Sequence, residues 1–234
     1  MVKALIFDVF GTVVDWRTGV SRDVAAYCAE AGLTIDAVAF AVAWRNLYQP
    51  AMEAIRSEGR GYVPLDVLHR ENLDKVLIDF SLDAAVGEAD RVRLNRAWEK
   101  LPPWPDSVPG LQRLKTRYPI APCSNGSIAL MTWLARYGGL PWDAILGAEI
   151  ARDYKPKPAV YIASAAAFGL RPEETMMVAA HNSDLDAARS AGLKTAFFPR
   201  LSEHGDNQTV DLEATSDWDV IANDMVDLAS KLVD

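Results

Sequence analysis

The fold of this chain is decided by the stretch Lys3-Ala4-Leu5-Ile6-Phe7-Asp8-Val9-Phe10-Gly11-Thr12. The apolar run over residues 4–7 has the length of a buried strand, and the carboxylate of Asp8 follows it directly. Gly11 then lets the chain turn sharply. Ligands of open α/β sheets bind beyond the carboxyl ends of the strands, so Asp8 is a candidate for chemistry, although a lone Asp there also caps turns.

The composition is typical of a soluble globular protein. Of the 234 residues, 50% are hydrophobic and 24% are charged, which suits one large domain or a core with an insert. The net charge of −8 disfavours general binding to nucleic acid or to anionic membranes. Cys28 and Cys123 lie far apart and indicate free thiols. Because we find neither a signal peptide nor an apolar run of transmembrane length, we expect a cytoplasmic protein.

Two patterns divide the chain. Residues 20–98 contain helical patterns, with one helix capped by Ser21 and a second that starts near Asp36 and is kinked or ended by Pro50. Two further helices are predicted over residues 65–80 and 83–98. From Pro102 onward, helices alternate with predicted strands over residues 119–123, 144–147, 176–180 and 195–198. This alternation is typical of a parallel sheet with helices on both faces. We predict an α/β fold with a core of residues 1–15 and 99–234, and an inserted helical cap of residues 16–98.

Polar side chains stand at four places on the predicted carboxyl edge of this sheet. They are Asp8, Thr12, Ser124, Asn125, Lys155 and Asp184. Each has an ordinary structural explanation, because Ser-Asn-Gly forms turns, a lysine is usually solvated, and an acidic residue suits the first turn of a helix. Their convergence on one edge of one sheet indicates an active site.

The order of these motifs resembles the haloacid dehalogenase superfamily, whose four motifs lie on a Rossmann-like core with a helical cap between the first and second. Within it, residues 8–12 are similar to the Asp-x-Tyr/Phe-Gly-Thr motif of the L-2-haloacid dehalogenase branch. Residues 124–127 and 154–156 resemble its second and third motifs, and Tyr161 stands at a tyrosine of that branch. The pair Trp44-Arg45 resembles a cap pair whose arginine faces the substrate.

The fourth motif departs from this pattern. Ala179-Ala180-His181-Asn182-Ser183-Asp184 stands where typical members of the branch have Ser-Ser-Asn-x-x-Asp. It resembles a subgroup of the branch, some of whose members act on short fluorinated acids. The role of His181 stays open between a neutral ring hydrogen-bonded behind the sheet and a part in the halide or water site.

The resemblance implies hydrolysis of a small anionic 2-haloacid without a metal or an organic cofactor. Asp8 would displace the halide and form an ester, which water then hydrolyses. Lys155 would keep Asp8 ionised, and Asp184 would orient Lys155 or activate the water. The other implied site residues are Thr12 and Ser124 as hydroxyl donors, Arg45 and Asn125 as ligands of halide and carboxylate, and Phe10, Tyr161, His181 and Asn182 around the substrate. The resemblance also allows a homodimer.

Three alternatives stay open. The same attack could displace another leaving group, as in ring opening of azetidine-2-carboxylate. A magnesium-dependent phosphohydrolase is disfavoured, because Phe10 replaces the proton-transferring aspartate of such enzymes and Ala180 replaces a magnesium ligand. A binding module without catalysis is the third.

Four further aromatic or basic residues complete the sequence predictions. Trp16 and Arg17 follow the first strand and are candidates to enter the pocket as the chain passes into the cap, but a packing role is the favoured interpretation of Trp16 and of Phe10. His69 and His204 have no identifiable partners, and we expect both at the surface.

Overall fold

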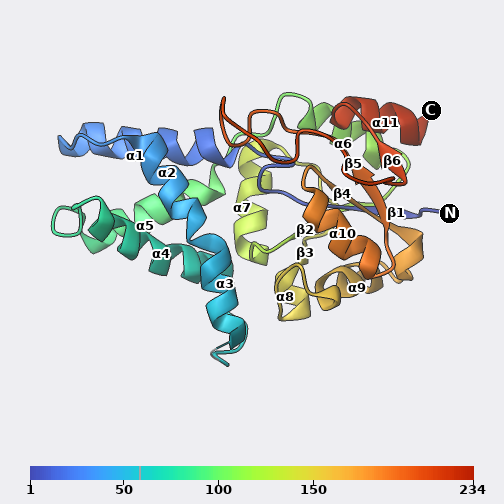
Figure 1. Ribbon diagram of the computed structural model, residues 1–234, viewed down its shortest axis with the longest axis horizontal. Helices are drawn as coiled ribbons and strands as arrows, with labels where there is room; N and C mark the ends of the chain where they lie inside the picture. Colours follow the sequence, from blue (N-terminus) through green and yellow to red (C-terminus); the bar gives the residue numbers. More distant parts are fainter. Residues whose placement is uncertain (58) are drawn as a thin grey trace.

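The chain forms a parallel sheet with helices on both faces, which confirms the predicted fold class (Figure 1). The computed structural model describes residues 1–57 and 59–234. The strands are β1 (Ala4–Phe7), β2 (Ile120–Ser124), β3 (Leu146–Gly147), β4 (Thr175–Ala179), β5 (Lys194–Phe197) and β6 (Val220–Ile221). They form one 6-stranded sheet in the order β3-β2-β1-β4-β5-β6.

The first strand lies inside the sheet and organises it. β1 pairs in parallel with β2 on one side and with β4 on the other. The chain therefore builds one half of the sheet outward from β1, and then returns to build the other half. Such a reversal of strand order creates the crevice in which these sheets bind ligands. Asp8 directly follows β1 and so lies at this crevice.

Both faces of β1 are buried, because successive side chains of a strand point to opposite faces. Leu5 and Phe7 belong to one apolar cluster, and Ile6 belongs to the other. The first cluster includes residues of α6 (Ser107–Lys115), α7 (Ile128–Gly138) and α11 (Met225–Val233), and the second includes residues of α9 (Pro158–Ala167) and α10 (Asn182–Ser190). Two short helices, α8 (Ala148–Ala151) and η2 (Pro172–Glu174), complete this part of the chain.

The helices between residues 16 and 99 lie to one side of the sheet (Figure 1). The elements of this helical segment are α1 (Trp16–Ala31), α2 (Ala37–Asn46), α3 (Tyr48–Ser57), α4 (Leu65–Asp79), α5 (Glu88–Asn95) and η1 (Arg96–Glu99). Residue 58, which falls within the predicted cap, lies outside the described residues. Within the described ranges, no helix is long and apolar enough to cross a membrane.

The helix boundaries in this segment differ from the predicted ones for local reasons. α1 begins at Trp16, since the side chain of Asp15 accepts a hydrogen bond from the backbone N–H of Thr18 and caps the helix. Ser21, the predicted cap, instead lies inside α1. The break after α2 falls at Leu47, and Pro50 lies in the first turn of α3, where a backbone N–H is not needed.

The strands of the core lie within two residues of their predicted positions, but the sequence pattern missed β6. This strand is only 2 residues long and its side chains are half-buried or exposed. Alternation of apolar and polar residues cannot be recognised over so short a length. The predicted helix over residues 83–98 is also shorter, because α5 begins only at Glu88.

Gly11 is required by the turn that follows β1. Its φ of 89° lies in the left-handed region, and a Cβ at this position would lie 2.1 Å from Oε1 of Glu203. The glycine therefore permits both the turn and the close approach of a distant carboxylate.

We predict that Gly11→Ala lowers the free energy of unfolding by at least about 2 kcal/mol, because backbone strain and a steric clash act together. Gly32→Ala is the matched control, since Gly32 has a φ of 67° with nothing within 4 Å of a built Cβ. The control should lose only about 1 kcal/mol. Urea unfolding measures the free energy of unfolding of both variants. An equal decrease in the two would contradict the close packing of Gly11 against Glu203.

Candidate active site

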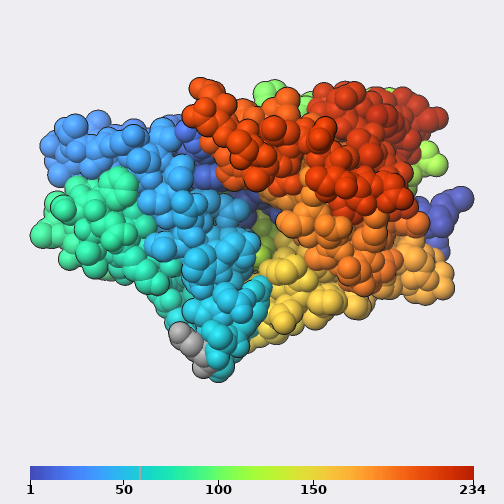
Figure 2. All heavy atoms as spheres, viewed as in Figure 1, coloured from blue at the N-terminus to red at the C-terminus, as the bar shows by residue number. Residues whose placement is uncertain are grey.

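A pocket of about 390 Å³ lies where the carboxyl end of the sheet meets the helical segment. Its lining from the sheet side consists of Asp8, Phe10, Asn125, Lys155, Pro156, His181, Ser183, Asp184, Glu203, His204 and Asp211. The helical segment contributes Arg45, Tyr48 and Gln49. In Figure 2, the light-blue helices that carry these three residues face the yellow and orange segments of the core.

Asp8 is held as a buried carboxylate with a cation at each oxygen. Nζ of Lys155 lies 2.8 Å from Oδ1, whereas Nδ1 of His181 lies 3.1 Å from Oδ2. Thr12 donates its hydroxyl hydrogen to Oδ2 over 2.7 Å. Burial by itself would raise the pKa of Asp8, but Lys155 and His181 outweigh it, and the pKa lies well below its usual value. Asp8 is therefore ionised at neutral pH, as a nucleophile must be.

Lys155 lies between two carboxylates. Its Nζ is 2.5 Å from Oδ2 of Asp184, and its backbone N–H donates to Oδ1 of Asn125 over 2.7 Å. Burial would lower the pKa of Lys155, but Asp184 and Asp8 raise it well above its usual value. Tyr161 donates its hydroxyl hydrogen to the other oxygen of Asp184 over 2.5 Å. These contacts fix the Lys155 ammonium against the candidate nucleophile.

His181 lies in the pocket between Asp8 and Glu203. Its Nε2 is 2.8 Å from Oε2 of Glu203, which is 2% exposed and also accepts a hydrogen bond from Nε1 of Trp16 over 2.9 Å. Burial would lower the pKa of His181, but Glu203 and Asp8 raise it well above its usual value. The ring therefore lines the pocket and does not lie behind the sheet, which was one of the two expectations for His181.

Glu203 was not among the residues predicted from the sequence. It lies in the loop that follows β5, where neither a strand nor a helix pattern marks it. The same rule that identified the other strand ends could have drawn attention to this loop, since β5 also ends at the carboxyl edge of the sheet.

Arg45 supplies a cation from the helical segment. Its guanidinium carbon lies 4.1 Å from the ring centre of Tyr48 and 5.6 Å from that of Trp16. No carboxylate of the described residues forms an ion pair with Arg45. The guanidinium is therefore held by aromatic rings while its hydrogen-bond donors are available to an anion in the pocket. Tyr48 and Gln49 also line the pocket and were not predicted.

Four predicted site residues do not line the pocket. Thr12 and Tyr161 lie behind Asp8 and Asp184, to which they donate hydrogen bonds. Ser124 accepts a hydrogen bond from the backbone N–H of Gly126 over 3.1 Å, and so fixes the turn after β2. The fourth residue, Asn182, is fully engaged elsewhere.

Asn182 anchors the C-terminal loop, which corrects the expectation that it contacts substrate. Its Nδ2 donates to Oδ1 of Asp211 over 2.8 Å and to the carbonyl of Glu213 over 3.0 Å. Its Oδ1 accepts from Nε1 of Trp218 over 2.9 Å and from the backbone N–H of Thr215 over 3.0 Å. All four hydrogen-bonding positions of this amide are satisfied within the protein.

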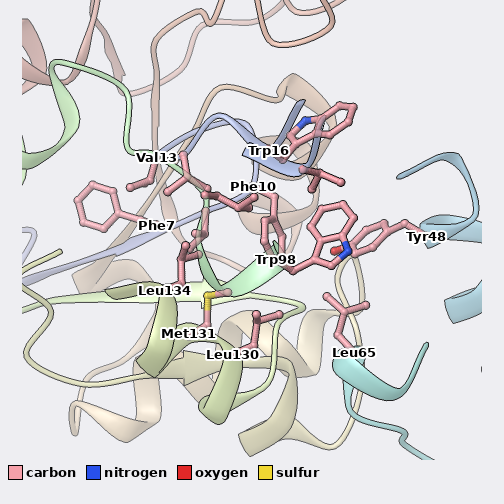
Figure 3. Packing of buried hydrophobic residues seen from close by; sticks show 14 of the residues in the cluster. Phe7, Phe10, Val13, Trp16, Tyr48, Leu65, Trp98, Leu130, Met131 and Leu134 are labelled. Atoms are coloured by element: carbon pink, nitrogen blue, oxygen red, sulfur yellow. The ribbon is translucent and has the colours of Figure 1, made fainter. Parts of the chain in front are cut away.

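Two further predictions concern histidines. The expected surface position of His69 is wrong, because the ring is 2% exposed and stacks on Trp98 with ring centres 4.2 Å apart. Figure 3 shows Trp98 beside Phe10, whose ring packs edge-on against it at 5.8 Å. His204 is exposed as expected, but it also lines the pocket, with Nε2 3.8 Å from Oε1 of Glu203.

Trp16 and Arg17 were candidates to enter the pocket, but neither lines it, and the burial of Trp16 agrees with the packing role that was favoured for it. Trp16 is buried behind Glu203 and reaches the site only through its hydrogen bond to that carboxylate. The guanidinium of Arg17 instead lies against Gly205, where a built Cβ would be 2.9 Å from its central carbon.

Comparison with known proteins places this site in a family. A sequence model of the haloacid dehalogenase-like hydrolases matches residues 2–192. The (S)-2-haloacid dehalogenase 4A of Burkholderia cepacia is 28% identical over 207 residues, which cover 87% of this chain and 84% of that protein. The crystal structure of a defluorinating L-2-haloacid dehalogenase superposes with a TM-score of 0.96 at 52% identity, covering 99% of this chain and 95% of the other. A second L-2-haloacid dehalogenase structure gives 0.95 at 44% identity, with 99% of each chain covered.

The position of Asn182 predicts that Asn182→Ala reduces stability rather than substrate binding. Loss of its hydrogen bonds should lower the free energy of unfolding by about 2–3 kcal/mol. Asn95→Ala is the matched control, because Nδ2 of Asn95 makes one hydrogen bond, to the carbonyl of Asp66, and the variant should lose about 1 kcal/mol. Urea unfolding and KM are measured together, and a raised KM with unchanged stability would return Asn182 to the substrate site.

Proposed function

Since the chain belongs to the haloacid dehalogenase-like hydrolase family, we propose that it is a hydrolytic dehalogenase of short 2-haloalkanoic acids. The observation that carries this proposal is Asp8, an ionised carboxylate that lines a pocket also lined by the guanidinium of Arg45. A small acid with a leaving group on C2 presents one carboxylate for Arg45 and one electrophilic carbon for Asp8. Haloacetates and 2-halopropionates have this form, and both fit a pocket of about 390 Å³.

The reaction proceeds in two displacements. An oxygen of Asp8 attacks C2 of the bound acid from the side opposite the halogen, the carbon–halogen bond breaks, and the halide leaves with its electron pair. The ester that forms is then attacked by water at Cγ of Asp8. The bond between Cγ and the Asp8 oxygen that attacked C2 breaks, and the 2-hydroxy acid leaves with inverted configuration and with that oxygen as its new hydroxyl group. One proton of the water is transferred to the departing oxygen and the other is released.

The other residues of the pocket have distinct parts in this scheme. Lys155 keeps Asp8 ionised and is itself oriented by Asp184. Asn125 uses Oδ1 to accept from the backbone N–H of Lys155 and also forms a side-chain hydrogen bond with Tyr48, which leaves one amide N–H for the halide or the substrate carboxylate. Both ring nitrogens of His181 are engaged by carboxylates, so this ring has no free donor for a halide.

A magnesium-dependent phosphohydrolase does not fit this donor set. Phe10 cannot transfer a proton, and Ala180 offers a methyl group where such enzymes carry a carboxylate ligand. Each oxygen of Asp8 already has a cationic partner, Lys155 or His181. In the described ranges, no group of three or more His, Cys, Asp or Glu side chains is arranged to hold a metal ion.

Ring opening of azetidine-2-carboxylate would use the same attack on C2, with a ring nitrogen as leaving group. The names of the three similar proteins described above favour a halide, because each of these three names refers to haloacids. Incubation with azetidine-2-carboxylate, followed by assay for the opened 2-hydroxy acid, separates the two reactions.

The fourth motif leads us to extend the proposal to fluoride as leaving group. The structure that is 52% identical to this chain is described as a defluorinating enzyme, and this similarity supports the subgroup inferred from residues 179–184. Release of fluoride from fluoroacetate, measured beside chloride release from chloroacetate, tests this extension.

The proposal includes the organisation and location of the chain. Residues 16–98 serve as a cap that brings Arg45 over a core of residues 1–15 and 99–234. A cytoplasmic location agrees with two buried free thiols, and the pKa of Cys123 is raised by burial to about 12. A homodimer stays a prediction from the family resemblance, and sedimentation of the purified protein would test it.

We predict that Asp8→Asn abolishes turnover, because the amide is not a nucleophile. Halide release from chloroacetate and from one enantiomer of 2-chloropropionate should fall by at least about 10⁴-fold. Addition of EDTA should leave halide release by the native enzyme unchanged. Asn keeps the shape of the side chain, so circular dichroism should show a folded protein. Halide release by the variant at the native rate would contradict the nucleophilic role of Asp8.

We further predict that Arg45→Ala raises KM by roughly 10–100-fold with little change in kcat, since a charge-assisted hydrogen bond to the substrate carboxylate is worth about 1.5–3 kcal/mol in both the ground and transition states. Arg70→Ala is the control, because Arg70 forms an ion pair with Glu88 and does not line the pocket. An unchanged KM in the Arg45 variant would show that the substrate carboxylate binds elsewhere.

A further inference from the structure

Both ring nitrogens of His181 face carboxylate oxygens, and this fixes the protonation state of the ring. Nδ1 lies 3.1 Å from Asp8 and Nε2 lies 2.8 Å from Glu203. An ionised carboxylate only accepts hydrogen bonds, and a neutral imidazole has a single N–H. Only the imidazolium, with two N–H groups, can donate to both partners at once.

The surroundings of His181 maintain this charge. Glu203 is buried, and its other carboxylate oxygen accepts a hydrogen bond from Nε1 of Trp16. The charged and titratable groups that share the pocket with the ring are Asp8, Arg45, Tyr48, Lys155, Asp184, Glu203, His204 and Asp211. Of these, the two carboxylates in contact with the ring dominate, and they outweigh the effect of burial on its pKa.

The two oxygens of Asp8 have different partners, and this asymmetry assigns different tasks to them. Oδ1 contacts Lys155, whereas Oδ2 accepts from His181 and from the hydroxyl of Thr12. The hydroxyl oxygen of Thr12 in turn accepts from the backbone N–H of Ala180 over 3.0 Å, which aims its hydrogen at Oδ2. Oδ2 is therefore held by two fixed donors, and Oδ1 is the oxygen that attacks.

We propose that the His181–Glu203 pair stabilises the oxyanion that forms on Oδ2 of Asp8 when water attacks the ester. This proposal rests on the proposed function. After Oδ1 has attacked C2, Oδ2 is the carbonyl oxygen of the ester. Addition of water to Cγ moves the carbonyl electron pair onto Oδ2, where His181 and Thr12 donate hydrogen bonds to it. Collapse restores the carbonyl and breaks the bond from Cγ to Oδ1, which leaves in the 2-hydroxy acid after accepting a proton.

In this scheme His181 is a catalytic residue, and Glu203 is a positioning residue that acts through it. The positively charged side chain of His181 lies next to Ala180, the position of the fourth motif at which metal-dependent members of the superfamily carry a magnesium ligand. The chain thus places a positive charge beside the nucleophile without a metal ion. Lys155, at Oδ1, is placed to give a proton to the departing oxygen.

Two variants test the proposal by separating the two chemical steps. Glu203→Gln removes the anion that holds the charge on the ring, and His181→Asn keeps a donor near Nδ1 but removes the positive charge. Rapid-quench assays with chloroacetate should show one equivalent of halide released in the first turnover, followed by turnover about 10²–10³-fold slower than in the native enzyme. Mass spectrometry should detect the ester on the Asp8 peptide in both variants during turnover.

The control is Glu174→Gln, in which a carboxylate paired with Lys3 is altered at the opposite edge of the sheet. This variant should release halide and turn over at the native rate. If Glu203→Gln turned over like the control without accumulating ester, or if it lost the first-turnover halide, the proposal would be wrong. If that variant does not fold, the same outcomes in His181→Asn decide. Failure of the native enzyme to release any halide would instead contradict the proposed function.

The pH dependence of kcat is a second test of the proposal, because a merely structural role for Glu203 would not alter it. Because the pKa of His181 is raised, the imidazolium is present below that pKa and is lost as the pH rises through it. The alkaline fall of kcat should therefore move to lower pH in Glu203→Gln. An alkaline limb that stays where the native enzyme has it would overturn the proposal.

Discussion

The carboxylate of Asp8 is the charge on which the rest of the site depends. A charge buried at the end of a central strand is costly unless it is paired and hydrogen-bonded. Lys155 and His181 arrive from segments more than a hundred residues further along the chain and meet the two oxygens of Asp8 separately. The turn at Gly11 leaves room for the carboxylate of Glu203, which contacts His181. The fold brings these segments together because their strands are neighbours in one parallel sheet.

The contacts form a row of alternating charges that runs through Asp184, Lys155, Asp8, His181 and Glu203. Three of these groups are negative and two are positive, so the row carries a net charge of −1. Such a row does not attract an anionic substrate by itself. Arg45, brought from the helical segment, adds the positive charge that a haloacid needs. Removing any inner member would leave two like charges without the group that separates them, which makes the row sensitive to single substitutions.

Much of the site could be predicted from the sequence, because the ends of the strands can be recognised in it. Asp8 directly follows a clear strand, whereas Lys155 and Asp184 lie near the starts of helices. The order of the strands places all three residues on one edge of the sheet. Glu203 could not be recognised, since it lies in a loop without periodicity and contacts His181 only in the folded chain. The burial of His69 was missed because a helix of mixed polarity does not reveal which face meets Trp98. Asn182 was misassigned because its motif position says nothing about the loop that it anchors.

The central claim is that Asp8 transfers one of its own oxygens to the product. The most direct measurement is a single turnover with enzyme in excess of chloroacetate in water enriched in oxygen-18. The account predicts that the glycolate released carries ordinary oxygen in its new hydroxyl group, and that the peptide containing Asp8 gains the heavy isotope. Heavy oxygen in the hydroxyl group of the product, with an unlabelled Asp8, would mean that water attacks C2 directly and would contradict the account.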